Sequence, residues 1–365
     1  MSELEGLLSQ LVAIDSVNPA LVPGGAGEAE IARYVAHWLE ERGLDVEVEE
    51  VVPGRPNVVG IAHGTGGGRS LLLNAHMDTV GYAGMDRPLE PMVSDGRLYG
   101  RGAYDMKASL AAIMLAGARA RERGLRGDVF ITAVCDEEVA SIGSEAVAGR
   151  YRVDAAVVSE PTEMRLCVAH KGFVWLEVET RGRAAHGSRP DLGVDAIAKM
   201  GQVLSGIDQL AGELAGREPH PLLGTGSVHA SLIEGGQELS TYPERCVLQL
   251  ERRTIPAEAP EQVEAEIRAL VDGIESDVRT TFVRHPFEVD ESEVVVEAVR
   301  RHAGQPETIG VPFWADSAVF QAAGIPTVVF GPGGEGAHAV EEWVSLDDAE
   351  RCADVYLAVA EEICG

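Results

Sequence analysis

A histidine and an aspartate separated by one residue follow a short apolar run in the first quarter of the chain. The run at 71–75 predicts a buried strand, and His76 and Asp78 stand where that strand ends. An imidazole and a carboxylate at the mouth of a strand suit a metal site, in which the carboxylate can fix the ring. An isolated pair of this kind is more often a strand-end histidine and a turn-forming aspartate. The metal interpretation therefore depends on other residues.

More acidic and histidine side chains stand just after predicted strands or at the start of a predicted helix. They are Asp105, Glu137, Glu138, Glu160 and His338. Each has a structural explanation by itself, since Asp105 can cap its helix and adjacent glutamates usually occupy a solvated turn. Ligands of open α/β sheets bind beyond the carboxyl ends of the strands, where side chains from distant parts of the sequence converge. Their repetition at successive strand ends favours one shared site.

The pattern around these residues predicts helices packed on a mixed or parallel sheet. Strands are predicted at 46–52, 58–62, 71–75, 129–135, 155–158 and 326–330, with helices at about 106–123 and from about 346. Between 172 and 284 the predicted order is β-α-β-β-α-β, the ferredoxin-like unit. We therefore expect an α/β fold with a discontinuous main domain, 1–171 plus 285–365, and an inserted ferredoxin-like domain at 172–284.

Composition excludes several classes of partner. With 365 residues and a formal net charge of −29, the chain lacks the basic face that nucleic acids or anionic membranes require. The N-terminus shows no secretory signal, and no apolar stretch is long enough to span a bilayer. The five cysteines are widely spaced, which indicates buried thiols in a reducing compartment. We expect a cytoplasmic protein that acts on a small molecule.

Taken in order, five motifs resemble those of the M20 family of zinc hydrolases, and the resemblance runs nearly the full length of the chain. The motifs are His76-x-Asp78, Gly102-x-x-Asp105-x-Lys107, Asp136-Glu137-Glu138, Ser159-Glu160-Pro161 and Gly336-Ala337-His338. That family includes acetylornithine deacetylase, succinyl-diaminopimelate desuccinylase, aminoacylase-1 and glutamate carboxypeptidases. The resemblance implies that the main domain is catalytic and that the inserted domain serves as a lid and a dimerisation surface.

The resemblance also implies a centre for two Zn²⁺ ions, with Co²⁺ or Mn²⁺ as substitutes. In the family pattern His76 and Glu160 hold one ion, Glu138 and His338 hold the other, and Asp105 bridges them. Imidazole and carboxylate ligands together fit this chemistry.

Further roles follow from the same resemblance. Glu137 matches the general base that takes a proton from the attacking water, and Asp78 matches the residue that orients the imidazole of His76. His186 matches the histidine that stabilises the tetrahedral oxyanion, which in dimeric members acts on the active site of the partner subunit. A histidine in a surface turn is the alternative explanation for His186.

Two positions in the inserted domain are expected to bind substrate. Arg253 matches the arginine that grips the substrate carboxylate, but Arg252 is its rival because neighbouring strand residues face opposite sides. His229 stands where many relatives have a substrate-binding asparagine, so the resemblance leaves specificity open.

The expected function is a metal-dependent amidohydrolase that cleaves the N-acyl amide of an amino acid or related carboxylate. Within the family the activity is expected to be most like that of the acetylornithine deacetylases or succinyl-diaminopimelate desuccinylases. The alternatives are a dipeptidase or carboxypeptidase that uses the same centre, and a catalytically silent metal-binding relative. Glu137 argues against the silent form, since a silent relative could lose its base while keeping its ligands. A homodimer through the inserted domain is also expected.

Overall fold

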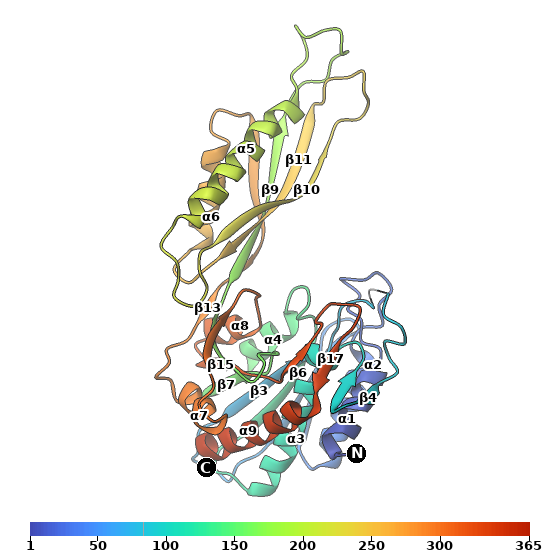
Figure 1. Ribbon diagram of the computed structural model, residues 1–365, viewed down its shortest axis with the longest axis vertical. Helices are drawn as coiled ribbons and strands as arrows, with labels where there is room; N and C mark the ends of the chain where they lie inside the picture. Colours follow the sequence, from blue (N-terminus) through green and yellow to red (C-terminus); the bar gives the residue numbers. More distant parts are fainter. Residues whose placement is uncertain (83) are drawn as a thin grey trace. The chain divides into compact units, whose positions relative to one another are not determined.

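The computed structural model describes residues 1–82 and 84–365, which form two compact units (Figure 1). The first unit contains Met1–Val168, Val289–Ile309 and Ala315–Gly365, and the second contains Ala169–Glu288 and Gly310–Trp314. Among the residues that the structure describes, no helix combines the length and apolar character that crossing a membrane requires.

The first unit is built on a mixed sheet with the strand order β1-β2-β6-β3-β7-β15-β8. These strands are β1 (Asp45–Val52), β2 (Arg55–Ala62), β6 (Val129–Val134), β3 (Leu71–His76), β7 (Ala155–Val158), β15 (Thr327–Val329) and β8 (Leu166–His170). β3 runs parallel to β6 and β7, and β15 runs parallel to β7. The carboxyl ends of these four strands therefore meet at one edge of the sheet.

Helices cover this sheet. They are α1 (Glu3–Ala13), α2 (Ala29–Glu41), α3 (Ala108–Arg123), α4 (Ile142–Arg150), α7 (Val294–His302), α8 (Ser317–Ala322) and α9 (Leu346–Cys364). The alanine-rich α3 packs on β2, β3 and β6, and α9 packs on α3 (Figure 1). Small side chains allow this close packing, because a Cβ atom at Gly117 would lie 2.4 Å from Ile131 Cγ1. The core of the unit thus lies between the sheet and these helices.

The first unit also contains a second, smaller sheet that the sequence did not predict. Its strand order is β16-β17-β5-β4, with the bounds β16 (Gly334–Glu335), β17 (Trp343–Ser345), β5 (Arg97–Tyr99) and β4 (Met92–Ser94). The pairing of β17 with β5 places Trp343 opposite Tyr99. It brings the segment before Asp105 beside the segment after His338.

The second unit has a four-stranded sheet in the order β10-β11-β9-β12. Along the chain its elements are β9 (Gly172–Arg181), α5 (Ala196–Ala215), β10 (Ser227–Gly235), β11 (Arg245–Thr254), α6 (Pro260–Leu270) and β12 (Ser276–Arg284). This is the predicted ferredoxin-like order. Alternation along β9 buries Val174, Leu176 and Val178 in a core that also holds Met200 and Ile207 of α5. Asp195 caps α5 by accepting a hydrogen bond from the N–H of Ala198.

Some element bounds differ from the expected ones for local reasons. The last strand of the predicted ferredoxin-like unit, β12, ends at Arg284, and a separate short strand, β13 (Phe287–Glu288), pairs with the end of β8. Pro286, which has no N–H to donate, lies in the break. A further strand, β14 (Thr308–Val311), pairs with β8. The helix expected from 106 begins at Ala108, because the preceding turn is irregular.

Candidate metal centre

Four of the expected ligands and the expected base lie at one edge of the main sheet. Some follow the ends of its strands, and one comes from the turn before α3. His76 is the last residue of β3, Glu160 lies two residues beyond β7, and Glu137 and Glu138 follow β6. Asp105 comes from an irregular turn, Ala103–Lys107, directly before α3. The parallel strands thus deliver three segments to the same place, and the start of a helix delivers the fourth.

The turn that carries Asp105 depends on glycine. Gly102 has a φ of 75°, in the left-handed region, and a Cβ atom there would lie 2.7 Å from Thr79 Cγ2. A larger residue would meet both the backbone preference and this side chain. Within the turn, Asp105 itself has φ −115° and ψ 94°, which are not helical values.

Two groups of side chains in the first unit have the composition and spacing of metal sites. His76, Asp105 and Glu160 form one group, and Asp105, Glu138 and His338 form the other, with the ligand atoms of each group within 4.8 Å of one another. Asp105 belongs to both. Its Oδ1 atom lies 3.1 Å from Nε2 of His76, and its Oδ2 atom lies 3.4 Å from Nε2 of His338. One carboxylate therefore faces both groups, each with a different oxygen.

The remaining distances complete the two groups. Glu160 Oε1 lies 3.8 Å from Nε2 of His76, and Glu138 Oε2 lies 3.1 Å from Nε2 of His338. Oε2 of Glu137 lies 3.9 Å from Nε2 of His76. Glu137 is thus beside the first group and directly follows Asp136, a residue with φ 68°. This turn separates Glu137 from the end of β6.

Burial and crowding perturb the pKa values of these groups strongly. Burial, together with the neighbouring Glu160, raises the pKa of Glu137 well above its usual value. Burial likewise raises the pKa of Glu160. Hydrogen bonds to Asp105 and Glu138 raise the pKa of His338 to about 10. Protons on the carboxylates or the imidazoles, or bound metal ions, relieve the repulsion between carboxylates gathered in this way.

The donor set fits divalent cations. Imidazole nitrogens and carboxylate oxygens are the mixture that zinc accepts, and cobalt and manganese accept it as well. Oε1 of Glu138 is buried and receives no hydrogen bond from any described residue. A buried carboxylate oxygen without a donor costs free energy unless a cation stabilises it. This atom belongs to the second group, so it supports a cation there.

Asp78 contacts the candidate site through both its backbone oxygen and its carboxylate. Its backbone oxygen lies 2.9 Å from Nδ1 of His76, which directs the lone pair of Nε2 toward Asp105 and Glu160. Its carboxylate accepts hydrogen bonds from the backbone N–H groups of Glu137, at 3.1 Å, and Glu138, at 3.2 Å. The carboxylate of Asp78 therefore positions the turn after β6, while its backbone orients the imidazole.

A buried polar network that the sequence did not reveal supports this turn. Asn18 donates to Asp78 at 2.8 Å and to Asp136 at 3.0 Å. Arg55 donates to Glu28 through two nitrogens, each at 2.5 Å, and to Asp136 at 3.0 Å. Glu28 stands at the start of α2, Arg55 at the start of β2 and Asn18 in a loop, so no spacing rule in the sequence could have linked these three residues to Asp78 and Asp136.

The other expected functional residues, Arg253, His229 and His186, lie in the second unit. Arg252 is fully buried and pairs with Glu258 and Glu266. The Arg253 side chain is 32% exposed; it pairs with Glu251 and lies over the ring of Phe173. Of the two arginines, Arg253 is therefore the one whose guanidinium faces outward. His229 is exposed on β10 in register with Glu251.

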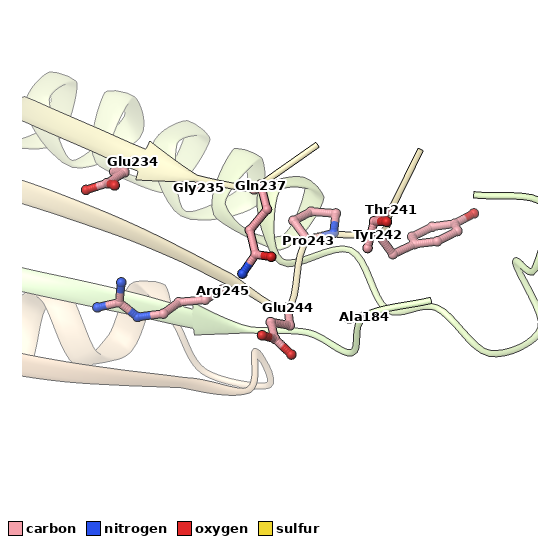
Figure 2. Close-up of a pocket in the computed structure, with 10 residues that line it drawn as sticks. Ala184, Glu234, Gly235, Gln237, Thr241, Tyr242, Pro243, Glu244 and Arg245 are labelled. Atoms are coloured by element: carbon pink, nitrogen blue, oxygen red, sulfur yellow. The ribbon is translucent and has the colours of Figure 1, made fainter. Parts of the chain in front are cut away.

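His186 lies in a loop that pairs with the segment before β11. His186 and Thr241 form an isolated antiparallel β-bridge. The backbone N–H of Tyr242 donates a hydrogen bond to the backbone oxygen of Ala185 at 2.8 Å. The N–H of Ser188 donates to Nδ1 of His186 at 3.2 Å, which leaves the proton of the neutral ring on Nε2. A pocket of about 260 Å³ adjoins this loop. Figure 2 shows Thr241, Tyr242 and Ala184 among the residues that line it.

The fold and the two side-chain groups define the class: a two-unit α/β protein with two groups of residues that could each hold a metal ion. Residues 72–362 match peptidase family M20/M25/M40, and this chain belongs to that family. It is 30% identical to an acetylornithine deacetylase of Myxococcus xanthus over 388 residues, which cover 99% of this chain and 98% of the relative.

Solved structures share the fold. Aminopeptidase PepT from Bacillus cereus is similar with a TM-score of 0.80 at 22% identity, over 99% of this chain and 98% of that one. The Bacillus subtilis YxeP protein, described as a dinuclear metal binding peptidase, has a TM-score of 0.75 at 18% identity, over 99% and 98% of the two chains.

Proposed function

We propose that this M20-family hydrolase uses two divalent metal ions to cleave the N-acyl amide of an amino acid or related carboxylate. The sharing of Asp105 between two ligand groups carries the proposal. His76, Asp105 and Glu160 would hold one ion, and Asp105, Glu138 and His338 the other, with Zn²⁺ as the expected metal and Co²⁺ or Mn²⁺ as substitutes. When bound, such ions supply Lewis acidity that acidifies a water molecule and polarises an amide carbonyl.

Glu137 is the proposed general base. It takes the proton of the attacking water on a carboxylate oxygen and returns it to the nitrogen of the leaving amine. Because burial raises its pKa, Glu137 binds that proton more readily than an exposed glutamate would, which suits a group that must accept and then donate. Asp78 keeps Glu137 in place through the bond to its backbone N–H.

The test is hydrolysis by the zinc-loaded protein of a panel of N-acetyl, N-succinyl and N-formyl amino acids and dipeptides. Glu137→Gln is expected to lower kcat at least about 100- to 10,000-fold while the bound metal remains. Glu163→Gln, a substitution at an exposed glutamate, is the control and should leave kcat unchanged. If the wild-type protein hydrolyses nothing in the panel, the silent metal-binding alternative replaces this proposal.

The similarity to acetylornithine deacetylase supports a deacylase, and the dipeptidase or carboxypeptidase activity is the second candidate. We propose that Arg253, assisted by His229, binds the substrate carboxylate, since Arg253 is outward-facing and Arg252 is buried in ion pairs. Arg253→Met should raise KM with a smaller effect on kcat. Arg279→Met, on an exposed arginine of β12, is the control. Equal KM values for the two variants would contradict this role.

We further propose that the chain forms a homodimer through the second unit and that His186 donates from Nε2 to the oxyanion in the partner subunit. β10 is an edge strand, and its Leu232 and Ile233 are 66% and 55% exposed. Mixing His186→Ala with Glu137→Ala subunits, each inactive, should restore up to about a quarter of the wild-type activity, because only mixed dimers carry one complete site. No recovery, or an active monomer, would contradict it.

A further inference from the structure

We infer that Glu342 is a positioning residue that ties the segment of Asp105 to the segment of His338 and thereby sets the metal affinity of the second ligand group. This inference rests on the proposed function, because it assumes that the two groups hold ions. Glu342 is 1% exposed. Its carboxylate contacts the backbone of the segment that carries Asp105 and does not belong to either ligand group.

The carboxylate of Glu342 organises the turn before α3. Its Oε1 atom accepts hydrogen bonds from the backbone N–H of Tyr104, at 2.9 Å, and of Asp105, at 3.1 Å. Its Oε2 atom accepts from the N–H of Gly102 at 3.0 Å. Three donors of one irregular turn therefore converge on a single side chain. Since this turn lacks regular helical hydrogen bonding, these contacts define where Asp105 lies.

Arg101 extends the connection to the His338 segment. This arginine is 1% exposed, and its Nη1 atom donates to Oε2 of Glu342 at 2.7 Å. Its Nη2 atom donates to the backbone oxygen of Ala339, the residue after His338, at 2.8 Å. A buried ion pair with this geometry is held firmly, because breaking it would leave a charge without a partner. The Arg101–Glu342 pair thus connects the turn that carries Asp105 to the segment that carries His338.

The two ligand groups depend on this connection unequally. In the first group, His76 ends β3 and Glu160 follows β7, and both are central strands of the main sheet. In the second group, Asp105 lies in the irregular turn and His338 has a φ of 62°, so both come from non-repetitive backbone. Loss of Glu342 should therefore disturb two of the three ligands in the second group and only one in the first.

The test compares Glu342→Gln with Glu341→Gln. The control removes the same charge from the adjacent, exposed glutamate. Metal-free proteins are titrated with Co²⁺, followed by visible absorption, and with Zn²⁺, followed by calorimetry. The wild type and the control should bind two equivalents. In Glu342→Gln the second equivalent should bind about 10- to 100-fold more weakly than in the wild type, and the first equivalent should lose less affinity than the second.

Activity provides a second readout that a general loss of folding would not produce. At one equivalent of Zn²⁺ per chain the Glu342→Gln protein should be largely inactive, and excess Zn²⁺ should restore its kcat toward the wild-type value. If Glu342→Gln fails to fold, Arg101→Met tests the same connection while leaving the three backbone bonds of Glu342 in place.

The outcomes separate the inference from the proposed function. Two equivalents bound by a folded Glu342→Gln or Arg101→Met protein with wild-type affinities would overturn the positioning role alone. Equal weakening of both equivalents would also overturn it, because the role predicts a selective effect. A wild-type protein that binds fewer than two ions would refute the dinuclear centre itself.

Discussion

Removal of Arg55 offers a quantitative test of the buried polar network that supports the candidate metal centre. The side chains of its partners, Glu28 and Asp136, are 0% and 4% exposed. Arg55→Met deletes both bonds to Glu28 and the bond to Asp136, and methionine keeps much of the side-chain volume. Removal of one partner from a buried ion pair costs about 3–5 kcal/mol, because the remaining charge is left without compensation.

That cost should depend on pH, because Glu28 can take up a proton. Burial already raises the pKa of Glu28, and Arg55 is the residue that opposes the increase. In Arg55→Met the pKa of Glu28 should rise further, so the folded state would hold a proton that the unfolded state releases. Stability then decreases as the pH rises above the unfolded-state pKa of about 4.3, by up to about 1.4 kcal/mol per pH unit, until the folded-state pKa is passed.

The measurement is urea denaturation at pH 6 and pH 8, with the same zinc concentration throughout. Arg119→Met is the control, because Arg119 pairs with Asp354 at 2.9 Å on the exposed surface. Such exposed pairs contribute about 1 kcal/mol or less. The reasoning would be refuted if Arg55→Met destabilised the protein no more than the control, or if its effect were the same at both pH values.

Two further predictions concern the metal and the base. Hydrogen bonds to Asp105 and Glu138 raise the pKa of His338 to about 10, so a metal ion must displace a proton from this ring at neutral pH. Affinity for the second ion should therefore rise by up to about tenfold per pH unit below pH 10, and an affinity without pH dependence in calorimetry would contradict this. Asp78→Asn replaces one accepting oxygen with a donor that faces the backbone of Glu137 or Glu138. Its kcat at saturating zinc should fall about 10- to 100-fold, and an unchanged steady-state kcat would show that the turn does not need this carboxylate.

The sequence could predict the fold class because its signals are local and periodic. Alternating apolar residues define strands, and the order β-α-β-β-α-β of the second unit is visible in that pattern. Convergence of the acidic residues could also be predicted, since parallel strands such as β3 and β7 end at the same edge. Neither step requires knowledge of contacts between distant residues.

The small sheet and the buried pairs had no such signal. β16 has two residues and β5 has three, which is too short for a periodic pattern. Arg101 and Glu342 are 241 positions apart, and nothing in a single sequence connects them. Arg55 resembles any surface arginine at the start of a strand until its burial is known. Long-range polar pairing therefore marks the limit of prediction for this chain.

The position of Asp105 between the two ligand groups has a thermodynamic consequence. If both groups bind ions as proposed, a single carboxylate that offers one oxygen to each group would make the two binding equilibria linked rather than independent. The factor by which an ion in one group changes affinity in the other must equal the factor in the reverse direction. The occupancy of each group would then depend on the occupancy of the other as well as on the free metal concentration. If both groups hold ions, a change in free metal concentration would, through this one side chain, shift the populations of empty, singly loaded and doubly loaded protein together.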